Sequence, residues 1–137
     1  MRVVVDTSAV ISMLMPDEDS GFFAEQMAKS NEILIGAPTG VECTMVLERV
    51  FPGMGRAHFD EWLSRTGAQV VPFSETHFRI AHDAYLLFGK GRHPAALNYG
   101  DCMSYAVALH ENLPLMQKGE DFKRATGISL INPRLRS

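Results

Sequence analysis

The sequence predicts an α/β fold, in which a central, mostly parallel sheet of four to five strands lies between two layers of helices as a single domain over residues 1–137. Short aliphatic runs alternate with longer amphipathic segments, which is typical of βαβ units. The length of 137 residues and the hydrophobic content of 46% suit one compact core. The sequence contains no repeat, linker or low-complexity segment that would divide this domain.

The first half of the chain predicts two strands and four helices. Residues 3–5 are a β-branched run typical of a buried parallel strand. Pro16 ends a short helix, because the residue before a proline disfavours helical geometry. The expected elements are a strand at 3–5, a helix at 9–14, a helix at 20–30, a strand at 33–35, a helix from Thr39 that contains VECTMVLERV, and a helix at 56–65.

The second half predicts three further strands and two helices. QVVPF at 69–73 is a strand terminated by Pro72. Ser74 is the expected N-cap of a helix that runs to residue 87, and a loop rich in glycine and cations follows it. Asp101 opens the next expected helix, DCMSYAVALHEN, and the sequences LPLM and ISLI predict short strands on either side of GEDFKRATG.

The overall charge excludes a globally basic nucleic-acid binder. The formal net charge is -3 and the pI is near 5.9, so any polyanion must be bound locally. Cys43 and Cys102 fall on apolar helix faces, which predicts buried thiols and neither a disulfide nor a zinc site. The apolar run at the N-terminus is shorter than the roughly 20 residues that span a bilayer and lacks a signal-peptide cleavage pattern, so we expect a cytoplasmic protein without a membrane anchor.

Four acids occupy positions that suit a site at the edge of the sheet. In open α/β sheets, ligands bind beyond the carboxyl ends of the strands, and each of these acids follows a strand or lies near the start of a helix. Either helix acid alone is also explained by the positive end of the helix dipole. If all four converge, their mutual repulsion requires a cation, and oxygen-only ligands favour Mg²⁺ or Mn²⁺. The four acids are Asp6, Glu42, Asp101 and Asp121.

Four segments together resemble VapC-type toxins of the PIN-domain ribonuclease family: VVVDTSAVI, the VE pair at 41–42, LNYGDCMSYAVA and PLMQKGEDF. The resemblance extends in order and spacing over nearly the whole chain and implies a PIN-like three-layer fold. It also implies that Asp6 and Asp101 are the principal metal ligands, with Glu42 as the third acid. Asp121 would be the fourth, and the neighbouring Glu120 is the alternative.

The same resemblance implies the activity and its partners. It predicts the toxin of a type II toxin–antitoxin system, a metal-dependent endoribonuclease that hydrolyses phosphodiester bonds of RNA and inhibits translation. We expect single-stranded or loop RNA as the substrate, because a splayed backbone reaches a recessed metal more easily than a duplex does. A VapB-like antitoxin would block the acidic pocket, and the toxin itself would form a homodimer.

Several polar residues are candidates for substrate contact. Thr7 and Ser8 can orient the carboxylate of Asp6 or contact RNA, and the alternative is that they cap the following helix. Asn98 can bind substrate or hold the turn before Asp101. A local basic rim for phosphates would be formed by Lys90, Arg92, His93 and Lys118, although charged loop residues are often simply solvated.

Three rival interpretations of the acidic residues require a different set of residues. A haloacid-dehalogenase-type phosphotransferase needs a second aspartate where Ser8 stands, and a receiver-like module needs adjacent acids where Thr7 follows Asp6. A PIN-like domain that binds RNA without cutting it would lack one of the acids.

The other histidines show no metal-ligand spacing along the chain, so we expect them on helix surfaces or in satisfied hydrogen bonds; they are His58, His77, His82 and His110.

Overall fold

The computed structural model of the protein describes residues 1–135, and the side chain of Asp121 lies outside that description. The strands are β1 (Arg2–Val5), β2 (Glu32–Gly36), β3 (Gln69–Val71), β4 (Leu115–Met116) and β5 (Leu130–Ile131). The helices are α1 (Thr7–Leu14), α2 (Ser20–Ala28), α3 (Ala37–Val50), α4 (Gly55–Thr66), α5 (Glu75–Phe88), α6 (Tyr99–Glu111) and the 3₁₀ helix η1 (Asp121–Arg124). No helix in this part of the chain combines the length and the apolar character needed to cross a membrane.

The five strands form one parallel sheet in the order β3-β2-β1-β4-β5. β1 is the central strand, and its Val4 pairs with Leu34 of β2 and with Leu115 of β4. The predicted parallel sheet is therefore confirmed. Because all strands run in one direction, the residues that follow β1, β2 and β4 lie at the same edge of the sheet.

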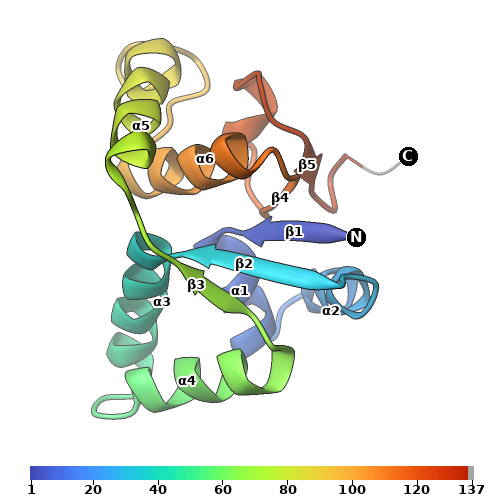
Figure 1. Ribbon diagram of the computed structural model, residues 1–137. Helices are drawn as coiled ribbons and strands as arrows, with labels where there is room; N and C mark the ends of the chain where they lie inside the picture. Colours follow the sequence, from blue (N-terminus) through green and yellow to red (C-terminus); the bar gives the residue numbers. More distant parts are fainter. Residues whose placement is uncertain (136–137) are drawn as a thin grey trace.

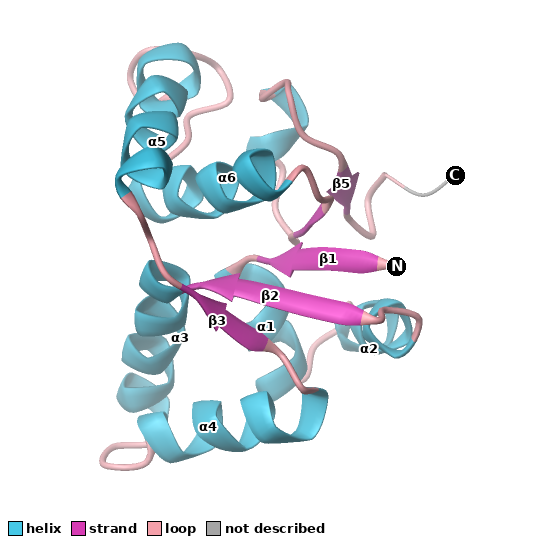
Figure 2. Cartoon of the chain, viewed as in Figure 1, coloured by secondary structure: helices cyan, strands magenta, loops and turns pink. Residues whose placement is uncertain are grey.

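Helices cover both faces of the sheet, as Figures 1 and 2 show. α5 and α6 lie on one face with a core that contains Val4, while α1 to α4 lie on the other face with a core that contains Val3 and Val5. This division follows from the alternation of side chains along a strand. The three-layer α/β/α architecture expected from the sequence is thus confirmed.

The starts of α1 and α6 differ from the sequence expectation. Asp6 is itself the N-cap of α1, because its carboxylate accepts the backbone N–H of Ser8. α6 begins at Tyr99 and is capped by Asn98, so the prediction that Asp101 opens this helix is wrong by two residues. Asp101 occupies the third helical position, where its carboxylate accepts the backbone N–H of Asn98 in a reciprocal capping box.

β3 is shorter than the predicted strand at 69–73. It ends at Val71, directly before Pro72, which has no N–H to continue the ladder. The strand lies at the edge of the sheet beside β2, and Val70 is exposed. β3 therefore serves mainly to carry the chain across to α5, whose predicted N-cap at Ser74 is confirmed.

Candidate functional site

Asp6 lies at the carboxyl end of the central strand and is held by two hydroxyl groups. Its Oδ2 accepts the hydroxyl of Ser8 at 2.7 Å, and its Oδ1 accepts the hydroxyl of Ser104 at 2.5 Å. The residue is only 6% exposed. Since hydrogen bonds to the charged form of a buried carboxylate stabilise it, these contacts fix both oxygens of Asp6 in one orientation.

Glu42 approaches this edge from the second turn of α3. Its Oε1 accepts the hydroxyl of Thr7 at 2.5 Å, which connects α3 to the start of α1. Gly100 of α6 lies so close that a Cβ atom there would come within 2.6 Å of Oε2 of Glu42. A residue with a side chain at position 100 would therefore displace the carboxylate, and the glycine leaves room for it.

Asp101 reaches the same edge from the first turn of α6. Its Oδ2 accepts the backbone N–H of Asn98 at 3.0 Å, and its own N–H is donated to Oδ1 of Asn98 at 2.9 Å. Asp101 precedes Ser104 by three residues, so the two lie on one face of the helix. Because Ser104 bonds Asp6 and Gly100 adjoins Glu42, α6 brings Asp101 to the edge that carries the other two acids.

The three acids do not form a tight chelating group. Among the described residues, the one set of three His, Cys, Asp or Glu side chains whose ligand atoms all lie within 4.8 Å of one another is His77, His110 and Glu111, which lies elsewhere. The carboxylates at the sheet edge instead accept hydroxyl and backbone N–H donors. A hard cation such as Mg²⁺, which keeps several waters, does not require so tight a group.

The fourth acid is only partly defined. Asp121 is the first residue of η1, and its side chain lies outside the described residues. The alternative, Glu120, pairs with Lys123 at 2.8 Å, and this hydrogen bond lowers the pKa of Glu120. Gly127, which follows η1, is not an acid and has no side-chain ligand. Its φ is 97°, and a Cβ there would lie 2.7 Å from the hydroxyl of Tyr105, so this position favours glycine.

The predicted basic rim is divided between two places. Lys118 directs its ammonium group to Asp17 and Asp19, and the hydrogen bond to Asp17 raises the pKa of Lys118. Its charge therefore lies within an ion-pair group beside α1. Arg92 lies over the ring of Tyr85 at 5.7 Å, and Lys90 lines a hollow together with Asn98.

The hydroxyl groups after Asp6 orient acids and do not cap α1. Thr7 donates to Glu42, and Ser8 donates to Asp6. The hydroxyl of Ser8 also accepts the backbone N–H of Lys118 at 3.0 Å, which connects the ends of β1 and β4. The capping alternative considered from the sequence is wrong for both residues, because Asp6 is the cap.

Three polar residues at this edge were not predicted from the sequence to belong to the site. Ser104 binds Asp6, and Thr39 lies 3.3 Å from the hydroxyl of Ser104. Ser104 could have been found, because a polar residue three positions after a candidate ligand shares its helix face. Gln117 directly follows β4 and is 1% exposed, and its Nε2 has no hydrogen-bond partner among the described residues.

The two cysteines are buried and free, as predicted. Burial raises the pKa of the Cys43 thiol to about 12, and the nearby charges of Asp6 and Glu42 act in the same direction. Burial also raises the pKa of Cys102 to about 11. Both thiols therefore stay protonated at neutral pH, which excludes a thiolate nucleophile at this edge.

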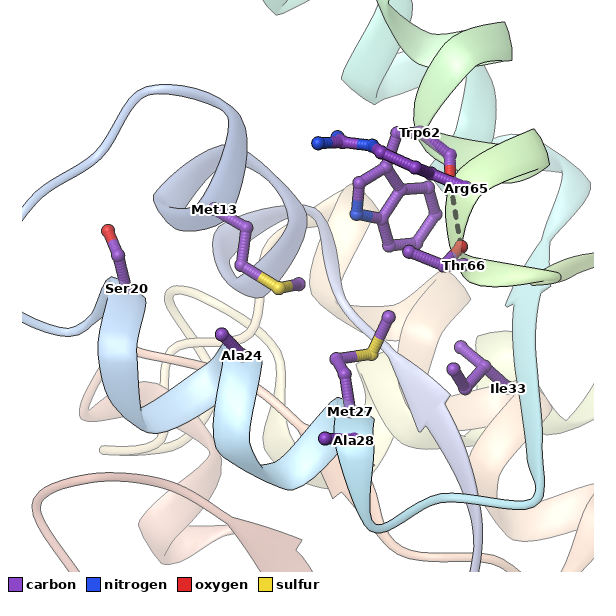
Figure 3. A pocket seen from close by; sticks show the side chains of 9 residues that line it. All are labelled: Met13, Ser20, Ala24, Met27, Ala28, Ile33, Trp62, Arg65 and Thr66. Carbon is purple, nitrogen blue, oxygen red and sulfur yellow. Dashed lines mark hydrogen bonds between the residues drawn. The ribbon is translucent and has the colours of Figure 1, made fainter.

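Among three hollows in the surface, one is lined by Glu42 of the acidic edge. A hollow of about 400 Å³ is lined by Glu42, Tyr99 and Gly100, and a neighbouring one of about 680 Å³ shares Tyr99 and is lined mainly by apolar side chains. A third, of about 510 Å³, lies between α1, α2 and α4 around Met13, Met27 and Trp62 (Figure 3). None of the predicted site residues lines this third hollow, so the acidic edge and its neighbours remain the candidate site.

Residues 3–128 match the PIN domain family. The chain is 39% identical over 122 residues to the VapC ribonuclease Mb0625 of Mycobacterium bovis, which covers 88% of this chain and 91% of that protein. It is 35% identical over 130 residues to the ribonuclease VapC of Mycolicibacterium smegmatis, with 95% of this chain and 100% of that protein covered.

Solved structures with low sequence identity share the fold. The crystal structure of VapBC2 from Rickettsia felis, bound to a promoter DNA fragment, has a TM-score of 0.77 and 18% identity, with 96% of this chain and 98% of that chain covered. That of Mycobacterium tuberculosis VapC20, described as a sarcin-ricin loop cleaving toxin, has a TM-score of 0.73 and 17% identity, with 92% and 96% covered.

Proposed function

The chain belongs to the PIN-domain family and, within it, to the VapC ribonucleases. On that premise we propose that it is the toxin of a type II toxin–antitoxin pair. It would cleave RNA with a divalent metal at the acidic edge of its sheet. The observation that carries the proposal is the carboxylate of Asp6. It follows the central strand, and the hydroxyls of Ser8 and Ser104 bind its two oxygens.

The donor atoms at this edge fit Mg²⁺ or Mn²⁺. They are carboxylate oxygens, which these hard cations prefer as ligands. Asp6, Glu42, Asp101 and Asp121 would hold the ion. When bound, such an ion neutralises the negative charge that develops on a phosphodiester and lowers the pKa of a bound water to make hydroxide available.

The residues around the acids have separate tasks in this proposal. Ser8 and Ser104 orient Asp6, Thr7 orients Glu42, and Asn98 holds the turn that presents Asp101. Preorganised ligands of this kind avoid the cost of rearrangement when the reaction begins.

RNA would approach past Tyr99, which is 76% exposed and lies between the hollow at Glu42 and the larger apolar hollow. Aromatic side chains stack on unpaired bases, which favours single-stranded or loop RNA over a duplex. Arg92 and Lys90 would supply the phosphate contacts, because they lie in the loop that leads into Asn98. Lys118 is a weaker candidate for this contact, since it already pairs with Asp17.

Two protein partners belong to the proposal. A VapB-like antitoxin would cover the acidic edge with an arginine, whose guanidinium binds carboxylates in a bidentate manner. A second copy of the chain would cover part of the exposed apolar surface of α3 and α5, which includes Val41, Met45 and Leu87. Light scattering on the purified chain, alone and with the antitoxin, tests both associations.

The direct test of the activity is cleavage of a fluorogenic single-stranded RNA in Mg²⁺ or Mn²⁺ and in chelator. We expect cleavage by the wild type only with metal, and none by Asp6→Asn. Asp83→Asn, an exposed acid of α5 away from the edge, is the matched control and should cleave normally. Equal cleavage by a folded Asp6→Asn variant, or cleavage that persists in chelator, would refute the proposal.

A further inference from the structure

His77 is a buried side chain with an unexplained polar atom. The residue is 3% exposed and occupies the third position of α5, where its Nδ1 accepts the backbone N–H of Ser74 at 2.9 Å. Its Nε2 is buried and has no hydrogen-bond partner among the described residues. A buried nitrogen without a hydrogen-bond partner destabilises the fold, so its retention needs a physical reason. The expected hydrogen bond is present at Nδ1, while Nε2 has no partner among the described residues.

Two further metal-binding side chains meet His77 at the end of α6. His110 and Glu111 are among the last residues of that helix, and one ligand atom from each of the three residues lies within 4.8 Å of the other two. The rings of His77 and His110 meet edge to face, with centroids 4.6 Å apart. Phe73 stacks on His77 at 5.1 Å and closes one side of the group.

We propose that His77, His110 and Glu111 form a second metal site, distinct from the acidic edge, that binds Zn²⁺ or a similar borderline ion. Two imidazole nitrogens and one carboxylate oxygen are a ligand set that zinc accepts and Mg²⁺ does not favour. The site would join the first turn of α5 to the last turn of α6. This inference goes beyond the proposed function and does not depend on it.

The protons can be arranged so that one ring nitrogen of each histidine is free to bind the ion. The hydroxyl of Ser74 lies 3.0 Å from Nδ1 of His77, so it can accept a proton carried on Nδ1 and leave the lone pair of Nε2 for the metal. In that tautomer the backbone N–H of Ser74 loses Nδ1 as its acceptor, so metal binding must offset the loss of one hydrogen bond of the capping box. An imidazole binds a metal only in its neutral form, so binding should tighten as the pH rises.

Arg2 is a further charged group near Glu111. Its guanidinium donates to Glu32, with Nε at 2.9 Å from Oε2. The cation of Arg2 therefore already has a carboxylate partner on β2.

The test is calorimetric titration of the whole chain with Zn²⁺, in a background of Asp6→Asn and Asp101→Asn that removes the acidic edge as a competing site. We expect one Zn²⁺ per chain in this background, and binding weakened at least about 10-fold by His110→Ala or Glu111→Gln. His110 is exposed, so its substitution should not unfold the chain. His82→Ala, an exposed histidine of α5 outside the group, is the matched control and should bind like the background.

A melting curve gives a second readout. An ion that binds only the native state raises the melting temperature, so Zn²⁺ should stabilise the background protein and His82→Ala but not His110→Ala. The proposal is overturned if the background binds no Zn²⁺, or if His110→Ala and Glu111→Gln bind and respond as the background does.

Discussion

The two ends of α6 carry different chemistry on one rigid element. Its first turn presents Asp101 beside Asp6 and Glu42, where the donors are oxygen atoms held by hydroxyl and backbone N–H groups. Its last turn presents His110 and Glu111 beside His77, where two of the three ligand residues are imidazoles. At 1.5 Å per residue, Asp101 and His110 are about 14 Å apart along the helix. The two proposed metal sites on this helix are therefore too distant to share an ion.

The two ends of α6 also differ in how they are stabilised in the absence of an ion. At the acidic end, each carboxylate already has hydrogen-bond donors, so the geometry is formed in advance. At the histidine end, Nε2 of His77 has no partner among the described residues, so an ion would add a bond that the fold lacks. We therefore expect substitutions at the acidic end to change activity, and substitutions at the histidine end to change stability.

The largest effect is expected for Asp101→Asn. The amide can still accept the N–H of Asn98 and so keep the helix cap, but it removes a negative ligand. RNA cleavage should fall at least about 100-fold, because most of the charge stabilisation at the reacting phosphate depends on the bound ion. Single-turnover cleavage measures the rate, and the melting temperature should stay near that of the wild type. A folded variant with wild-type activity would contradict the assignment of this end.

The next effect is expected for Ser104→Ala. It removes the donor that binds Oδ1 of Asp6, and loss of a group that orients a metal ligand typically lowers metal affinity or activity about 10- to 100-fold. Ser12→Ala is the matched control, because Ser12 is a buried serine whose hydroxyl binds Asp17. Both variants should lose roughly 1 kcal/mol in urea unfolding, but only Ser104→Ala should lose activity. Equal activity in the two variants would contradict a positioning role for Ser104.

A smaller effect is expected for Gly100→Ala. Alanine favours a helix over glycine by up to about 1 kcal/mol, yet a Cβ at position 100 would push the carboxylate of Glu42. We expect activity roughly 10-fold lower without loss of stability, in line with the cost of displacing one oriented ligand. Gly21→Ala on α2, where no atom lies within 4 Å of the new Cβ, should gain stability and keep full activity. A fully active Gly100→Ala protein would show that the position of Glu42 does not matter.

The smallest effect is expected at the histidine end, in the pH dependence of stability. Burial lowers the pKa of His77 below its usual 6.5, His110 acts in the same direction, and Glu111 opposes them. The unfolded chain therefore binds a proton that the folded chain refuses, so stability should fall as the pH drops below about 6.5. His77→Gln keeps a residue that can complete the capping box with Ser74 and removes this titration. Urea unfolding at pH 5.5 and 7.5, without added metal, should show a smaller difference for the variant; an equal difference would contradict the assigned shift.

The fold and most positions of the candidate site could be predicted from the sequence. The β-branched run at 3–5 and the aliphatic run at 33–35 each precede a helix, and a parallel sheet brings their carboxyl ends to one edge. That reasoning depends only on strand direction and the order of elements. It therefore gives the general place of Asp6 and Asp101, but not which hydroxyls bind them.

The partners of these acids depended on contacts between distant segments. Ser104 and Asp6 are 98 residues apart, and His77 and His110 meet because two helices pack together. Local spacing places Ser104 on the helix face of Asp101. It gives no signal for the pairing of His77 with His110, so the histidine group was missed. The pairing of Lys118 with Asp17 could not be predicted either, because it forms only when the ends of β4 and α1 come together.

The most direct test of the acidic edge is anomalous diffraction from a crystal soaked in Mn²⁺. We expect an ordered peak bound by the carboxylates of Asp6 and Asp101. An absent peak, or an ordered Mn²⁺ bound only at His77 and His110, would contradict the claim that the acidic edge holds the catalytic ion.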